Sequence, residues 1–140
     1  MVRKGFTLLE VIIVITLISI IGAVVIPNFT NATVKTKLQS DIESAKILQS
    51  AIDLYNAQEP ESISESTSID TFDKIVTELN SKEYIKQKKY VAQSSGAKFI
   101  YDSTNNIVLV DVTSSPDDVT ASVEKINEND SIYLTGVTEK

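Results

Sequence analysis

Residues 4–28 read KGFTLLEVIIVITLISIIGAVVIPN, and the apolar run within them begins at Phe6, directly after Arg3, Lys4 and Gly5. Glu10 is the only ionisable residue between Phe6 and Ile26. A carboxylate inside an apolar run is costly unless it reaches water or a cation. The reason for its presence four residues after Phe6 is therefore the first question about function.

The length of this run matches the thickness of a membrane. At about 1.5 Å per residue, a helix over residues 6–27 is roughly 30 Å long, which is the hydrocarbon thickness of a bilayer. Its many β-branched residues favour strand in water, but in lipid only a helix satisfies its own backbone groups. We therefore predict a transmembrane and assembly helix over residues 6–27.

The flanking charges alone do not decide the orientation of this helix. Arg3 and Lys4 precede it, whereas Lys35 and Lys37 follow it, so the charges nearly balance. The short leader favours an amino terminus inside the cell. A cleaved secretory signal fits poorly, because the small residues before a cut are interrupted by the bulky Ile21, but an uncleaved signal anchor stays open.

Glu10 has two explanations. In a single membrane helix it lies only about 6 Å along the axis from Phe6, so its side chain can reach the headgroups. Alternatively, the chain is cut between Gly5 and Phe6, and the new α-amino group of one copy meets Glu10 of a neighbour in a staggered bundle. At ~4 Å and an effective dielectric constant of about 20, that pair offers about 4 kcal/mol before desolvation, and it specifies the stagger more than it adds stability.

A known family has the same residues in the same order. Residues 4–11, the apolar run and the Ile-Pro-Asn at 26–28 resemble the amino-terminal segment of type IV pilins and type II secretion pseudopilins. The resemblance implies a class III leader over residues 1–5, which a prepilin peptidase removes between Gly5 and Phe6 before N-methylating Phe6. It also implies that Phe6 and Glu10 act in filament assembly.

The resemblance further implies a weak point in the helix. In the family the helix near the matching proline is often kinked or locally melted in the filament. Pro27 supplies a physical reason, because it lacks an N–H donor and clashes with the carbonyl of Ala23. Gly22 weakens the helix further. We therefore expect a helix kink at Pro27 and Gly22.

The helical pattern continues from Pro27 to about Ala57 in amphipathic form. Apolar residues recur at steps of three and four on one face: Leu38, Ile42, Ala45, Leu48, Ile52 and Tyr55. Residues 59–68 read as a surface loop. A second helix follows, capped by Ser68 or Asp70 and ending near Asn80, and it should close over the sheet with one face: Phe72, Ile75, Val76 and Leu79.

The pattern of the carboxy-terminal part predicts a β-sheet. Residues 97–112 read as a β-hairpin, and a third strand over residues 131–137 follows an acidic excursion. The predicted fold class is α+β, a pilin-like fold in which a long amphipathic and transmembrane helix packs on a small antiparallel β-sheet. Residues 28–140 form the globular domain, with residues 28–57 as the second half of the long helix.

Composition excludes several kinds of site. The chain has neither His nor Cys, which removes the usual general base, thiol chemistry and thiolate metal sites. Two acids could cleave a glycoside, but no motif for a cleft accompanies them, so we predict no enzyme, no catalytic residue, no cofactor and no metal site. Calcium ligation by the acidic stretch 117–130 stays open, although that stretch lacks the spacing of a calcium loop.

The charge argues against nucleic acid as a main partner. The net charge is -6, and the lysines at 82, 86, 88 and 89, around Tyr84 and Tyr90, can neutralise few phosphates. We read this cluster as a solvated turn and leave nucleic acid uncertain.

The predicted function is that of the major structural subunit of a type IV pilus. Its partners are other copies of the chain in a helical filament, the prepilin peptidase, the assembly machinery and, for the precursor, the inner or cytoplasmic membrane. Two alternatives stay open: a pseudopilin of a type II secretion or competence DNA-uptake system, and a membrane-anchored binding domain that does not polymerise. The sequence does not distinguish motility, adhesion and secretion.

Overall fold

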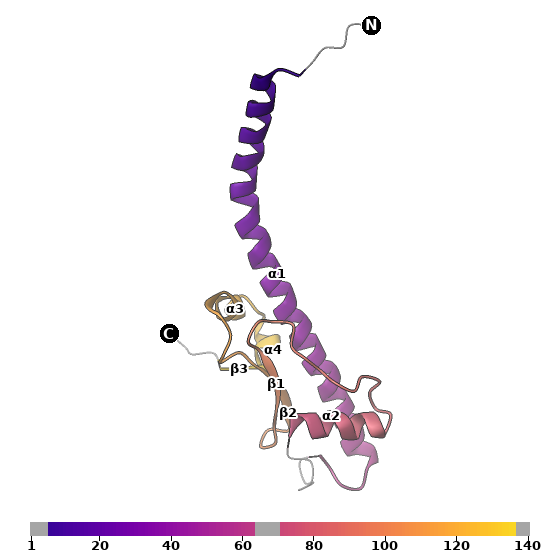
Figure 1. The fold of residues 1–140 in the computed structure, drawn as a ribbon. Coiled ribbons are helices and arrows are strands. Elements are labelled where there is room, and N and C mark those ends of the chain that lie inside the picture. Colours follow the sequence, from indigo (N-terminus) through magenta and orange to yellow (C-terminus); the bar gives the residue numbers. More distant parts are fainter. Residues whose placement is uncertain (1–5, 64–70, 137–140) are drawn as a thin grey trace, which may run out of the picture. The chain divides into compact units, whose positions relative to one another are not determined.

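The computed structural model describes residues 6–63 and 71–136, without the side chains of residues 24 and 26–28. Along the chain (Figure 1) the elements are α1 (Leu8–Gln58), α2 (Phe72–Ser81), β1 (Lys98–Asp102), β2 (Ile107–Asp111), α3 (Asp117–Val123), α4 (Glu128–Ser131) and β3 (Leu134–Thr135). The chain divides into two compact units, Met1–Thr33 and Val34–Lys140, and α1 contributes residues to both.

The long helix and its buried face are confirmed. Residues 6–57 were predicted to be helical, and α1 spans Leu8–Gln58. Every residue of the predicted apolar face is at most 7% exposed: Leu38, Ile42, Ala45, Leu48, Ile52 and Tyr55. These side chains form one hydrophobic core with Val108, Val110 and Val112 of the sheet region. Burial of this face is what holds the sheet on the helix.

The predicted hairpin is confirmed, with β1 and β2 antiparallel from Lys98 opposite Asp111 to Asp102 opposite Ile107. Asp102 shapes its turn, because Asp102 Oδ1 accepts a hydrogen bond from the Thr104 N–H at 2.9 Å. Asn106 then takes a positive φ of 53°, a conformation that Asn tolerates better than most residues.

The sheet is mixed, whereas an antiparallel sheet was predicted. Its order is β1-β2-β3, and β3 pairs with β2 in parallel, with Val110 opposite Leu134. The long excursion between these strands, which includes α3 and α4, brings the chain back in the same direction, as a parallel crossover requires. Within the described residues, β3 covers only Leu134–Thr135 of the predicted strand 131–137, and Ser131 belongs to α4 instead. Val137 lies outside the described residues. The α+β class and the packing of a long helix on a small sheet are confirmed.

Helix α2 closes over one end of the sheet, as predicted. Ile75, Val76 and Leu79 are buried, and the Phe72 ring stacks on Phe99 of β1 with 5.6 Å between the centroids. Thr71 is the N-cap and forms no side-chain capping bond. The predicted caps, Ser68 and Asp70, lie outside the described residues.

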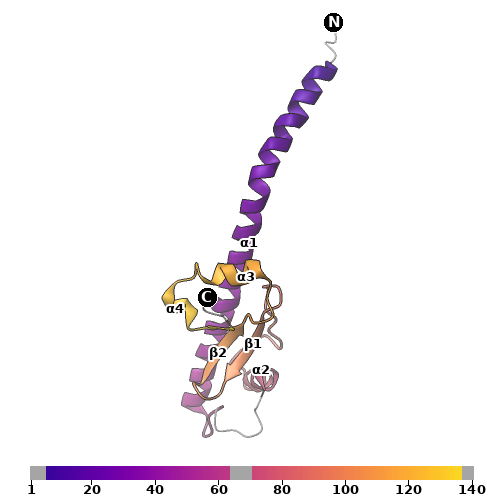
Figure 2. The same cartoon turned by 90° about the vertical axis from the view of Figure 1, so that its left-hand side faces the viewer.

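The acidic excursion contains two short helices that the sequence analysis did not predict. Helix α4 is tied to α1 through Lys46, whose Nζ lies 2.7 Å from Asp130 Oδ1 and 2.9 Å from Glu43 Oε1. The hydrogen bonds to Asp130 and then to Glu43 raise the pKa of Lys46. In the view of Figure 2, α4 and α2 lie on different sides of the hairpin.

Helix α1 is assigned as helical without interruption through Gly22 and Pro27. Among the residues that the structure describes, no helix is identified as long and apolar enough to cross a membrane. The membrane helix over residues 6–27 stays a prediction from the sequence, as does the kink that we expect in a filament.

Candidate processing and assembly site

The candidate site lies at the start of α1. Gly5, the predicted cleavage residue, lies outside the described residues. Phe6 is the first described residue and is 85% exposed. Because α1 begins at Leu8, Phe6 is presented ahead of the first helical turn.

Thr7 and Glu10 cap the start of the helix reciprocally. The Thr7 N–H and the Thr7 hydroxyl donate hydrogen bonds to Glu10 Oε2, at 2.9 and 2.8 Å. The Glu10 N–H in turn donates to Thr7 Oγ1 at 3.3 Å. This arrangement is a capping box, which satisfies amide groups that the first turn leaves without helical partners.

The capping box leaves half of the Glu10 carboxylate available. Both hydrogen bonds from Thr7 end on Oε2, and Oε1 accepts none within the described part of the chain. An ionised carboxylate can accept about four hydrogen bonds. Glu10 can therefore cap its own helix and bind an external cation at the same time.

The surface of α1 around and beyond this cap is apolar. Within the unit that ends at Thr33, large apolar residues from Phe6 to Phe29 are exposed by between 47% and 85%. An exposed apolar surface of this extent marks a region that contacts lipid or other protein. The site thus combines one carboxylate with a long apolar helix that lacks a covering within its own unit.

The structure brings one unpredicted residue into this site. Phe6 and Glu10 were predicted to act in this site and Thr7 was not, although Thr-x-x-Glu at positions 7–10 is the sequence signature of a capping box. Cleavage after Gly5, methylation of Phe6 and pairing of Phe6 with Glu10 between copies stay predictions.

The acidic stretch 117–130 does not form a metal site in the structure. Within residues 6–63 and 71–136, no group of three or more His, Cys, Asp or Glu residues is placed to hold a metal ion. Asp117 and Asp118 lie in the first turn of α3, and Asp130 is paired with Lys46. The carboxylates of the acidic stretch 117–130 are therefore divided among separate local structures.

Comparison with known proteins identifies the amino-terminal segment. Residues 1–26 match the model of the prokaryotic N-terminal methylation motif. A fimbrial protein of Pseudomonas aeruginosa is 32% identical over 69 residues, which cover 49% of this chain and 45% of the relative. The type II secretion system core protein G of Escherichia coli is 34% identical over 53 residues, which cover 38% of this chain and 37% of the relative.

A core protein G of Klebsiella michiganensis is 36% identical over 53 residues, with the same 38% and 37% coverage. The chain thus spans less than half the length of these curated relatives. None of these names denotes an enzyme. No solved structure matches the chain. The resemblance read from residues 4–28 is confirmed: the amino terminus matches the prokaryotic N-terminal methylation motif, and the chain is similar over part of its length to a fimbrial protein and to type II secretion system core proteins G.

Proposed function

We propose that the chain is a structural subunit of a helical filament, the major subunit of a type IV pilus, assembled from a membrane-inserted precursor. The observation that carries this proposal is the methylation motif over residues 1–26, which includes the exposed apolar start of α1 and its single acid, Glu10. The similarity to a fimbrial protein supports the same function.

Processing creates the charge that assembly needs. Hydrolysis of the bond between Gly5 and Phe6 consumes one water and leaves a carboxylate on the leader and an α-amino group on Phe6. N-methylation of that amine keeps its positive charge. The precursor has its amino terminus inside the cell and its apolar helix in the membrane, where lipid covers the helix.

Assembly then replaces lipid by other copies of the same helix. In a staggered bundle, the Phe6 amine of one copy reaches Oε1 of Glu10 in its neighbour, an oxygen that accepts no hydrogen bond from the described residues, while Oε2 keeps its bonds to Thr7. Because the pair is surrounded by apolar side chains, leaving either charge without its partner costs several kcal/mol, about 3–5 by analogy with broken buried pairs. The charge pair therefore selects one stagger among the many that apolar packing alone would allow.

A second function has a specific observation in its favour. The relatives named core protein G are as similar to this chain as the fimbrial protein, at 34% and 36% identity. In that case the filament is a pseudopilus of a type II secretion system within the cell envelope. A role in DNA uptake has less support, because Lys82 of the lysine cluster is already paired with Glu59 at 3.0 Å.

The filament proposal is tested by the mass and location of the mature protein. Cells that produce the chain at natural levels are sheared, and the released fraction is analysed by intact mass. We expect surface fibres whose subunit begins at N-methylated Phe6, and we expect Gly5→Leu to leave an uncut chain in the membrane. Full-length monomers that still begin at Met1 in the wild type would contradict the proposal.

Deletion of the gene separates the two filament functions. If the chain is a pilus subunit, the deletion should remove surface fibres and leave the release of secreted proteins unchanged. If the chain is a pseudopilus subunit, the deletion should make secreted proteins accumulate inside the envelope and leave surface fibres unchanged.

A further inference from the structure

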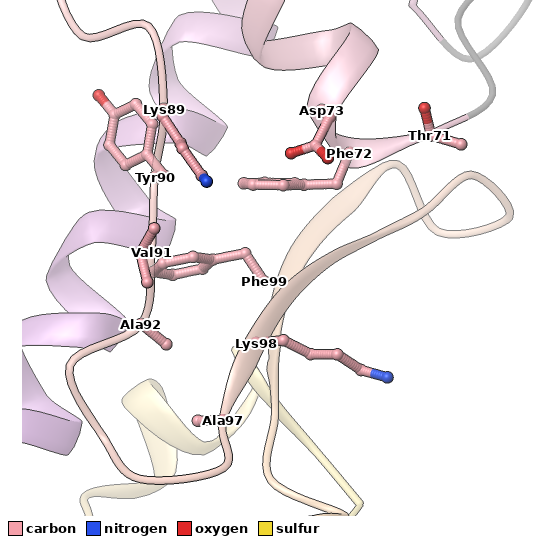
Figure 3. Close-up of a pocket in the computed structure, with 10 residues that line it drawn as sticks. All are labelled: Thr71, Phe72, Asp73, Lys89, Tyr90, Val91, Ala92, Ala97, Lys98 and Phe99. Atoms are coloured by element: carbon pink, nitrogen blue, oxygen red, sulfur yellow. The ribbon is translucent and has the colours of Figure 1, made fainter.

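A pocket opens between the start of α2, residues 89–92 and β1 (Figure 3). Its volume is about 400 Å³, which is within the usual range for sites that bind a side chain or small ligand. Aromatic rings form its wall: Phe72 stacks on Phe99, and Tyr90 meets Phe99 edge to face with 6.4 Å between the centroids.

The rim of the pocket is apolar and cationic. Val91 is 69% exposed, so the apolar wall continues to the surface. Lys89 and Lys98 line the pocket together with one acid, Asp73. Lys98 already lies 3.3 Å from Asp111 Oδ2, whereas Lys89 forms no ion pair within the described part of the chain. In Figure 3 the side chain of Lys89 is directed toward Phe72 and that of Lys98 away from the rings.

A surface that is complementary to this pocket in charge and in apolar character lies next to β3. Ile132 is 58% exposed and takes helical backbone angles directly after α4. Glu128 therefore stands one helical turn before Ile132 and on the same face. The nearby Asp130 is neutralised by Lys46, so Glu128 remains as an exposed acid beside an exposed apolar side chain. We call Glu128 and Ile132 the α4 knob.

The pocket and the α4 knob occupy opposite edges of the sheet. The strand order is β1-β2-β3. The pocket includes Lys98 and Phe99 of the edge strand β1, and the α4 knob directly precedes β3 at the other edge. A contact between two different surfaces at opposite edges is heterologous, so it continues from copy to copy and does not close a dimer.

We propose that the pocket of one copy receives the α4 knob of a second copy, with Ile132 against the aromatic wall and Glu128 beside Lys89. The contact rests on the filament proposed above, which holds neighbouring copies at high effective concentration. The apolar side chain supplies the attraction, and the charge pair at the rim fixes which way the knob enters. The contact adds a link between globular domains to the link between helices.

Site-directed crosslinking tests this contact directly, because the chain has no Cys and introduced thiols meet no background. Val91→Cys is placed on the pocket rim and Asn129→Cys beside the α4 knob, both in the full chain at exposed positions. Treatment of sheared filaments with a short bismaleimide should give a ladder of dimers, trimers and higher species. Val91→Cys with Leu54→Cys, at a 48% exposed position of α1, is the matched control and should give at least fivefold less product.

Variants of the contact residues show what occupies the pocket. Adding Ile132→Ser to the cysteine pair should lower the ladder at least fivefold. Lys89→Glu and Glu128→Lys should each lower it several-fold, and the two together should restore it. Lys86→Glu, at an exposed lysine that does not line the pocket, should leave the ladder unchanged.

The outcomes separate this proposal from the proposed function. Filaments of normal yield with no ladder, a ladder that ends at the dimer, or a double charge variant no better than the single variants would overturn the contact and leave the filament standing. If the wild type forms no filaments, the proposed function fails. The same cysteine pair, crosslinked in concentrated detergent solution of the full chain, then decides the contact: a ladder supports it and monomers alone overturn it.

Discussion

Asp41 holds Gln93 against the long helix, 52 residues further along the chain. The Asp41 residue is 1% exposed. Its Oδ1 accepts the Gln93 N–H at 2.7 Å and its Oδ2 accepts the Ser94 N–H at 2.9 Å. One buried carboxylate of α1 thus fixes residues 93–94, which connect the pocket-lining residues 89–92 to β1. Its two hydrogen bonds replace those to the water that burial removes.

Asp41→Ala should destabilise the domain. The change leaves two backbone N–H donors without an acceptor, and each buried, unsatisfied donor costs about 1–3 kcal/mol. We expect a loss of about 2–4 kcal/mol in the free energy of unfolding, measured on the full chain in detergent by near-ultraviolet circular dichroism during denaturation. Glu61→Ala, at an exposed position, is the control. Equal stability of the two variants would show that Asp41 does not hold the segment.

Glu10→Gln should separate the two roles of Glu10. A glutamine keeps the capping box with Thr7, because its amide oxygen also accepts hydrogen bonds. It loses the negative charge that pairs with the Phe6 amine. We therefore expect normal leader removal and a normal helix start, but at least tenfold fewer sheared filaments.

Thr7→Val is the counterpart of that change, because it removes the hydroxyl that caps the helix and keeps the charge of Glu10. It should weaken the first turn by about 0.5–2 kcal/mol, the usual effect of losing a cap, and lower filament yield less than Glu10→Gln does. Filaments at wild-type yield from Glu10→Gln would remove the charge from the assembly proposal.

Gly96→Ala should be far more harmful than Gly22→Ala. Gly96 has a φ of +74°, and a Cβ there would overlap the carbonyl oxygen of Ser114. A left-handed conformation alone costs an alanine about 1–2 kcal/mol, and the overlap adds to this. At Gly22, by contrast, no atom lies within 4 Å of the added Cβ apart from the adjacent residues and the backbone of the helix itself. Thermal unfolding should shift to lower temperature for Gly96→Ala, whereas Gly22→Ala should not lower it, because alanine favours helix more than glycine does.

Acid should remove the contribution of Asp111 to stability. The hydroxyl of Thr113, then its N–H, and then Lys98 lower the pKa of Asp111 below its ordinary 3.8. A pKa that is depressed in the folded state contributes stability above the pKa of the unfolded chain, and this stability is lost as the pH falls through the folded-state pKa. The difference in stability between wild type and Asp111→Asn should therefore shrink as the pH falls below about 4.

The hydroxyl of Thr113 can be tested separately. Thr113→Val removes the first of these causes, so the pKa of Asp111 should rise toward 3.8 in an NMR titration of its carboxyl carbon. Thr113→Ser keeps a hydroxyl and should leave the pKa where it is. If the pKa of Asp111 is unchanged in Thr113→Val, its lowering would be due to the backbone N–H of residue 113 and to Lys98.

Features that depend on residues close in sequence could be read without the structure. The apolar face of α1 from Leu38 to Tyr55 follows from the 3.6-residue period of a helix. The hairpin over 97–112 follows from two apolar runs around a turn. The capping box of Thr7 and Glu10 is equally local, and its signature was present though not used. In each case the spacing along the chain fixes the geometry.

Features that join distant segments needed the folded chain. Nothing local requires β3 to pair with β2 in parallel, because that pairing depends on how α3 and α4 carry the chain back to the sheet. The stacking of Phe72 on Phe99 and the hold of Asp41 on Gln93 join segments that approach each other only once the core has formed. Periodicity predicts which face of an element is buried, but the partner of that face is set by packing and loop closure throughout the domain.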